Sequence, residues 1–219
     1  MRHLLEFDSI RLSFGTRVIL SDVFMKCETG KITGLLGRNG QGKTCLMKIV
    51  YGELTAAERS IRFDQVSVPN PCLRPDLLRY LPQFNFFPTF LTLKKVFDDF
   101  SLDFSTFEKR FPEFRPKYRS RLRTLSGGQL RFVQTYIIVK ANTRFSLLDE
   151  PFTHLMPLQI EKMIELILEE KEHKGFLITD HLYRHILDIS DYLYILVDGA
   201  THAIRNIEEI EAHGYISLK

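Results

Sequence analysis

Residues 32–44 read ITGLLGRNGQGKT. The first five form a short, mostly apolar run, and beyond Gly37 the apolar residues recur at helical spacing until Gly52. Between the run and the helix lies the pattern G-x-x-x-x-G-K-[ST], whose glycines let backbone N–H groups turn toward phosphate oxygens at a helix N-terminus. The sequence therefore predicts a strand, a phosphate-binding loop (P-loop) and a helix, in that order.

This loop contributes the first candidate site residues. Lys43 is expected to reach the β- and γ-phosphates of a nucleotide, and Thr44 to place its hydroxyl on Mg²⁺. The alternative is a glycine turn that carries a lysine by chance, and the flanking strand and helix argue against it. The candidate nucleotide-binding residues of the loop are Gly37, Arg38, Asn39, Gly40, Gln41, Gly42, Lys43 and Thr44.

Strand-like and helical segments alternate along the rest of the chain, and Asp198-Gly199 is typical of a hairpin turn. This alternation predicts an α/β fold built on a parallel sheet. The P-loop makes this a P-loop NTPase core, and the turns between the strand-like segments of the first 36 residues lead us to expect an N-terminal antiparallel β subdomain. The expected segments are strands at 4–13, 18–27, 61–68, 145–149, 176–179 and 192–197 and helices at 129–141 and 158–174.

The segment from Phe84 to Arg123 differs in composition from its surroundings. It contains ten of the 18 phenylalanines and a predicted helix at 91–100. We interpret it as a small inserted helical subdomain, spanning about residues 84–125 of a single domain that covers residues 1–219.

The overall composition excludes several classes of protein. Hydrophobic residues make up 44% of the chain and charged residues 26%, which is typical of globular domains and not of disordered or fibrous chains. Three widely spaced cysteines indicate neither a disulfide framework nor a zinc site. No apolar run approaches the roughly 18 residues that span a bilayer, and the N-terminus lacks the apolar core of a signal peptide. We therefore expect a cytoplasmic protein.

The net charge of +3 is unevenly distributed. Residues 110–123 hold six basic side chains and one acidic side chain, Glu113, so the rest of the chain is nearly neutral. This distribution does not match a protein that coats nucleic acid. The basic segment is either a solvated helical face or a contact for anionic lipid or an acidic partner.

Two adjacent carboxylates, Asp149 and Glu150, end the predicted strand at 145–149. Such a pair is costly to bury unless a cation neutralises it, and a magnesium nucleotide does so. Asp149 is expected to hold the metal, and Glu150 to orient and deprotonate the attacking water. Strands often end in an aspartate, so the functional interpretation depends on the P-loop upstream.

The pentapeptide LSGGQ, residues 125–129, begins a predicted helix, and its Ser126 lies 23 residues before Asp149. With this pentapeptide the sequence resembles the ABC family of ATPases, of which LSGGQ is the signature. Ser126 and the amides of Gly127 and Gly128 form a second anion site at a helix N-terminus. The resemblance implies that Ser126, Gly127, Gly128 and Gln129 cap the ATP held by the P-loop of another subunit, in a head-to-tail dimer.

The resemblance extends over essentially the whole chain. Gln83 resembles the family's Q-loop glutamine, which contacts Mg²⁺ and the attacking water, and His181 resembles the switch histidine, which contacts the γ-phosphate. Phe14 resembles the aromatic residue that stacks on adenine, with a core phenylalanine as the alternative. One position departs from the family. Met156 stands where an aspartate usually links the two sites, so we expect the coupling between them to be weak.

The resemblance implies a subunit that binds and hydrolyses ATP with Mg²⁺ and powers transport through a separate transmembrane permease. It further implies a homodimer or pseudo-homodimer on ATP binding, at the cytoplasmic face of the membrane, with no direct contact to nucleic acid. Phe84, Phe86, Phe87 and Phe90 would line the permease groove unless they belong to the core. Two alternatives remain: a soluble ABC ATPase acting on nucleic acid or ribosomes, and a regulatory ATP-binding module.

Overall fold

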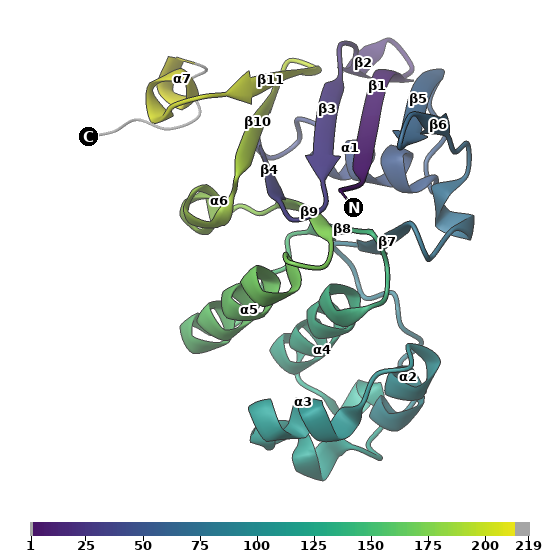
Figure 1. Ribbon diagram of the computed structural model, residues 1–219, viewed down its shortest axis with the longest axis vertical. Helices are drawn as coiled ribbons and strands as arrows, with labels where there is room; N and C mark the ends of the chain where they lie inside the picture. The colour runs from purple at the N-terminus through teal and green to yellow at the C-terminus, as the bar shows by residue number, and fades with distance from the viewer. Residues whose placement is uncertain (1, 213–219) are drawn as a thin grey trace.

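The computed structural model of the protein describes residues 2–212. Two β-sheets pack against the helix that follows the P-loop (Figure 1). This helix, α1 (Lys43–Tyr51), begins after Gly42 and ends at Gly52, and both glycines have left-handed backbone conformations. It contributes Leu46 and Ile49 to a hydrophobic cluster that also contains residues of both sheets. The predicted order of strand, loop and helix is confirmed.

The N-terminal sheet is antiparallel, as predicted. Its strands are β1 (Leu4–Phe14), β2 (Arg17–Leu20), β3 (Phe24–Glu28), β5 (Glu58–Phe63) and β6 (Val66–Ser67). The central strand β1 pairs with β2, β3 and β5, and β5 pairs with β6.

Two of the predicted N-terminal strands are wrong in detail. The strand expected at 18–27 is interrupted, because the amides of Ser21 and Asp22 both donate to the carbonyl of Gly199. The strand expected at 61–68 is a hairpin, because Asp64 and Gln65 form a turn with φ angles of 50° and 67°. Turns with two left-handed residues match the twist of the strands that they connect.

The second sheet has the order β11-β10-β4-β9-β8-β7 and is parallel except for the edge strand β11. The edge strand β7 has no counterpart among the predicted strands, although its leucines are buried. Asp198-Gly199 forms the predicted hairpin turn between β10 and β11. The strands are β4 (Ile32–Leu36), β7 (Leu78–Leu81), β8 (Phe145–Asp149), β9 (Gly175–Thr179), β10 (Tyr192–Val197) and β11 (Ala200–Ile204).

Helices α4 and α5 run side by side below the parallel sheet in Figure 1, and their apolar residues share one cluster with β4, β8 and β9. The predicted helices at 129–141 and 158–174 are confirmed, but the second ends at Glu170, and Lys174 turns into the core. Within residues 2–212, no helix combines the length and the apolar character needed to span a bilayer. The α-helices between residues 127 and 212 are α4 (Gly127–Lys140), α5 (Pro157–Glu170), α6 (Tyr183–Ile189) and α7 (Ile207–Ala212).

The phenylalanine-rich segment packs against α4 (Figure 1). It contains the predicted helix as α2 (Leu93–Asp99) and a further helix, α3 (Phe104–Arg110), that was not predicted. Buried phenylalanine rings of the segment contact the rings of Phe132 and Tyr136 of α4, in stacked, tilted and edge-on arrangements. Helix α3 ends at Arg110 and 3-10 helices follow, so the basic residues of 110–123 are solvated but do not share one α-helical face. Within residues 2–212, the 3-10 helices are Pro71–Leu73, Pro112–Lys117 and Leu122–Thr124.

Candidate nucleotide site

The loops that follow β4, β7, β8 and β9 lie at the carboxyl edge of the parallel sheet, where open α/β sheets bind ligands. They carry the P-loop, Gln83, Glu150 and His181. A cavity of about 530 Å³ opens there, a volume suited to a small-molecule ligand. Eight of its lining residues were predicted from the sequence, and Arg17, Ile19 and Cys45 were not. The predicted ones are Phe14, Asn39, Gly40, Gly42, Lys43, Thr44, Gln83 and Glu150.

The P-loop backbone has a shape that only glycine accommodates. Gly40 and Gly42 have φ angles of 83° and 101°, which side-chain-bearing residues rarely adopt. A Cβ atom on Gly42 would also lie 2.8 Å from a methyl carbon of Ile19, and one on Gly37 would lie 2.8 Å from the carbonyl oxygen of Leu196. The close approach of these strands therefore fixes the loop in this shape.

The buried ammonium of Lys43 crosses this loop and donates hydrogen bonds to the carbonyls of Gly37 and Arg38. Burial lowers the pKa of Lys43, while the nearby carboxylates of Glu150, Asp149 and Asp180 oppose that shift. A phosphate group in the cavity would supply the anion that favours the charged form.

Two other P-loop side chains do not line the cavity. Arg38 is exposed, and its contribution is the backbone carbonyl that Lys43 contacts. The side-chain oxygen of Gln41 accepts a hydrogen bond from the amide of Asp198, at 3.2 Å, and so joins the loop to the β10–β11 turn. The lining of this cavity therefore gives no support to the predicted contact of the Arg38 and Gln41 side chains with the nucleotide.

Asp149 is 1% exposed, and its carboxylate is surrounded by hydroxyl groups. The hydroxyl of Tyr80 donates to it at 3.1 Å, and Thr44 also hydrogen-bonds to it. Burial raises the pKa of Asp149, and these two hydrogen bonds lower it. One carboxylate, one hydroxyl and the nearby Gln83 fit Mg²⁺, which typically takes few protein oxygens and completes its shell with water and substrate phosphates.

The catalytic candidates Glu150 and His181 are neighbours. Nδ1 of His181 lies 3.9 Å from a carboxylate oxygen of Glu150 and 3.3 Å from one of Asp180. Asp180 is buried and accepts hydrogen bonds from the amides of Phe152 and Leu182, at 3.0 and 2.9 Å. It therefore joins the segment after Glu150 to the segment that carries His181. Neither Asp180 nor Tyr80 was predicted as a site residue, because their roles depend on contacts between distant segments.

The signature residues lie outside this cavity. Ser126 is exposed and caps the N-terminus of α4. Its hydroxyl accepts a hydrogen bond from the backbone amide of Gln129, and the side-chain oxygen of Gln129 accepts one from the backbone amide of Ser126. A Cβ atom on Gly128 would lie 2.6 Å from the carbonyl oxygen of His154, so the packing of the 153–155 segment requires glycine there. Within a single chain, the P-loop thus lies beside the carboxylates of Asp149 and Glu150, whereas the signature residues lie away from this cavity.

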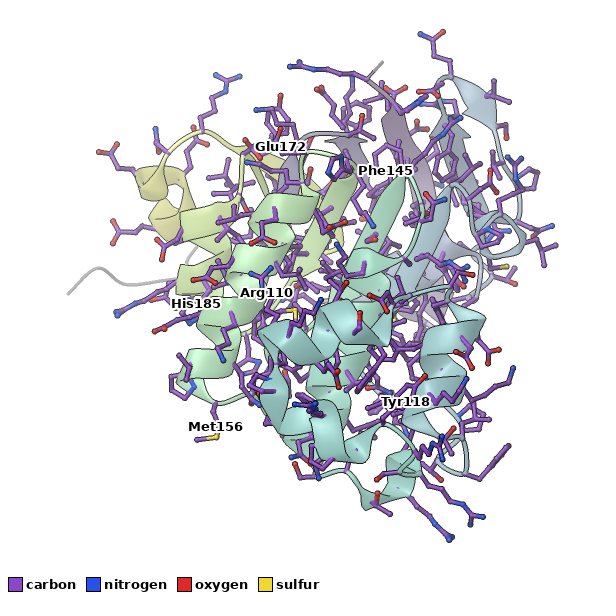
Figure 2. The ribbon with its side chains drawn as sticks, turned by 60° about the horizontal axis from the view of Figure 1, so that its bottom comes forward. Arg110, Tyr118, Phe145, Met156, Glu172 and His185 are labelled. Atoms are coloured by element: carbon purple, nitrogen blue, oxygen red, sulfur yellow. The ribbon has the colours of Figure 1, made fainter. Side chains whose placement is uncertain are left out.

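Met156 lies at the start of α5, close to this signature. Its side chain is 69% exposed, and Figure 2 shows it projecting from the edge of the molecule. Weak coupling through this position stays a prediction.

Phe14 ends β1 with 56% of the residue exposed, so the alternative of a core phenylalanine is wrong. Phe14→Ala is expected to weaken ATP binding by about 1–3 kcal/mol, because a base loses its stacking surface. ATP and GTP should be affected alike, since stacking reads no base edge. Calorimetric titration with both nucleotides checks this. Phe24→Ala, an exposed residue of the same sheet outside the cavity, is the control. Unchanged affinity in Phe14→Ala would show that the stacking residue lies elsewhere.

Comparisons with known proteins agree with this geometry. The family model described as ABC transporter matches residues 20–153. The lipopolysaccharide export system ATP-binding protein LptB of Acidithiobacillus ferridurans is 31% identical, over 96% of this chain and 93% of that protein. The branched-chain amino acid transport ATP-binding protein BraG of Pseudomonas aeruginosa is 26% identical, over 90% of each chain.

The fold is also that of known ATP-binding cassettes. A solved ATP-binding subunit of an ABC transporter superposes with a TM-score of 0.80, covering 96% of this chain and 93% of that one at 23% identity. The predicted fold class and family resemblance are confirmed. The chain belongs to the ABC transporter family and is an ATP-binding, ATP-hydrolysing subunit.

Proposed function

We propose that the protein hydrolyses ATP with Mg²⁺ in a head-to-tail dimer and thereby drives a separate membrane permease. One observation carries this proposal: the P-loop, Gln83 and Glu150 line one cavity, while the exposed signature residue Ser126 lies outside it. Each subunit therefore holds one half of two different sites. A second copy of the chain, in the opposite orientation, supplies the missing half.

Each side chain has a role that follows from its position. Lys43 pairs with the phosphates, and Phe14 stacks on the base. Glu150 accepts the proton of the attacking water, and Gln83 and His181 orient the water and the γ-phosphate. Thr44, Gln83 and Asp149 would hold Mg²⁺, which when bound neutralises phosphate charge and polarises the transferred group. Ser126, Gly127, Gly128 and Gln129 of the second subunit donate to the phosphates from the other side.

We assign the described chain to one ATPase domain, with residues 84–125 as its helical subdomain. The last residues of the assigned range, 213–219, lie outside the described part of the chain. Helices α2 and α3 support this assignment, because their phenylalanines form a continuous core with α4.

The helical subdomain also offers a surface for the permease. Phe84 and Phe90 are 69% and 67% exposed, whereas Phe86 and Phe87 are half-buried beside a cavity of about 370 Å³. Among the described residues, Arg119, Arg121 and Arg123 make no ion pair. Arg110, in contrast, pairs with Glu165 and Glu169 of α5 and belongs to the fold. Exposed aromatic rings beside unpaired cations suit an acidic, partly apolar segment of a permease.

Reversing the charge of Arg119, Arg121 and Arg123 together is expected to release the protein from membranes of cells that make the whole transporter. Each rim charge is worth about 0.5–1 kcal/mol, so the affinity for the permease should fall roughly tenfold or more. Immunoblots of the membrane and supernatant fractions measure this. Reversal of Arg11, Arg74 and Arg205 is the control; all three are exposed outside the helical subdomain, and Arg11 and Arg74 make surface ion pairs with Glu58 and Asp76. An unchanged membrane fraction would rule out this surface. If the wild-type protein is found with ribosomes, the result would favour the alternative of a soluble ABC ATPase that acts on nucleic acid or ribosomes.

The relatives differ in cargo: their names state lipopolysaccharide export, branched-chain amino acid transport and, for a Sulfolobus acidocaldarius relative at 29% identity, xylose and arabinose import. What they share is the ATP-binding subunit, and that shared role is the one we propose. The direct test is magnesium-dependent phosphate release by the purified protein with its permease. Absence of ATP turnover in the assembled complex would contradict the proposal and favour a regulatory module.

A further inference from the structure

The guanidinium group of Arg131 lies inside the protein, between the two segments that carry Gln83 and Glu150. Arg131 is 5% exposed and comes five residues after Ser126, on α4. One of its terminal nitrogens donates to the carbonyl of Pro82 at 2.7 Å. The other donates to the carbonyls of Asp149 and Glu150 at 2.5 and 2.8 Å. A single side chain therefore contacts the backbone on both sides of the reaction centre.

Glu150 needs such contacts because its backbone is left-handed, with a φ of 52°. This conformation is unfavourable for a residue with a side chain and persists only where the surroundings fix it. The amide of Glu150 donates to the carbonyl of Thr179 at 2.8 Å, and its carbonyl accepts from Arg131. Without the guanidinium, the buried carbonyl of Asp149 and the partly buried carbonyl of Glu150 lose this donor. The Glu150 peptide can then relax, which would swing the carboxylate out of the cavity.

The other contacts of α4 with these loops do not reach the reacting side chains. Gln134 hydrogen-bonds to the side chain of Asn85, and Thr135 donates to the carbonyl of Pro151. A second buried cation offers a comparison. Lys174 is 3% exposed and donates to the carbonyls of Val139 and Ala141, at the far end of α4 from the cavity. Arg131 and Lys174 are thus both buried cations that donate to backbone carbonyls, at opposite ends of α4.

We propose that Arg131 is a positioning residue for ATP hydrolysis, whose guanidinium holds the backbones of Pro82 and Glu150 where Gln83 and Glu150 can act on the attacking water. The inference rests on the proposed hydrolytic function. Since α4 begins with Ser126, the same side chain connects the signature of one ATP site to the catalytic carboxylate of the other.

The test compares Arg131→Gln, Arg131→Lys and Lys174→Gln in the assembled transporter. Arg131→Gln should lower kcat about 100-fold, the loss associated with a misplacement of about 1 Å. The Kd for ATP should change less than about threefold, because the P-loop contacts are intact. Lysine lacks the planar fork of arginine and should restore kcat only in part. Lys174→Gln should lower the Tm by a similar amount to Arg131→Gln and leave kcat near the wild-type value.

Three outcomes would overturn the inference: a wild-type kcat in Arg131→Gln, a parallel loss of kcat and ATP affinity, or an equal loss of kcat in Lys174→Gln. If Arg131→Gln does not fold, Arg131→Lys carries the same comparison of kcat with Kd. Glu150→Gln, measured alongside, separates this inference from the proposed function. Wild-type turnover in Glu150→Gln refutes the assignment of the base, whereas an inactive Glu150→Gln with a fully active Arg131→Gln refutes only the role of Arg131.

Discussion

Glu150→Gln is expected to abolish ATP turnover and to leave ATP binding intact. The amide has the size of the carboxylate but cannot accept the proton of the attacking water, and a general base contributes about 10²- to 10⁴-fold to a rate. Contacts of Lys43 and the P-loop with the phosphates do not involve the Glu150 side chain, so the Kd should stay near the wild-type value. The variant should therefore accumulate as an ATP-bound dimer. Phosphate release, nucleotide titration and light scattering with ATP measure these three properties.

Glu172→Gln is the matched control, because Glu172 is an exposed carboxylate outside the cavity (Figure 2). It should match the wild type in turnover and in Kd. If Glu150→Gln hydrolyses ATP at the wild-type rate, another group is the base.

Lys43→Met should weaken ATP binding about 10²- to 10⁴-fold, because removing one partner of a buried charge pair costs about 3–5 kcal/mol. The protein without nucleotide should keep a Tm close to that of the wild type, because the loss of the hydrogen bonds to Gly37 and Arg38 is offset by the loss of a buried ammonium, whose pKa burial lowers. A titration with ATP and a thermal melt without it distinguish lost binding from lost folding.

Lys48→Met is the control on the same helix, where Lys48 pairs with Glu53 at the surface. Its effect on ATP binding should be slight, because exposed ion pairs contribute little. A fall in affinity of less than about fivefold in Lys43→Met would show that the ammonium does not pair with the phosphates.

The parts of the site that local sequence determines were predicted best. The P-loop glycines and the signature follow from backbone geometry at the start of a helix, and Glu150 follows a strand whose apolar run is unmistakable. Arg131 could not be predicted in the same way. In sequence it is one more basic residue on a helix, and only the packing of α4 brings Pro82 and Glu150 to its guanidinium.

The same distinction holds for the fold. Alternation of apolar segments predicted the core strands and the long helices. It missed β7 and α3, which are short elements of four and seven residues. It also could not separate Phe14 and Phe90, which are exposed, from the buried phenylalanines of the helical subdomain, because the residue type is the same and only tertiary packing differs.

The claim that each ATP site is built from two subunits is tested most directly by mixing two inactive variants. Lys43→Ala disables the P-loop, and Ser126→Arg blocks the signature. A mixed dimer keeps one complete site, formed by the intact P-loop of one chain and the intact signature of the other. Because Met156 predicts weak coupling, we expect an equal mixture to recover about a quarter of the wild-type rate, as independent sites add. A mixture as inactive as the separate variants, although mixed dimers form, would contradict the account.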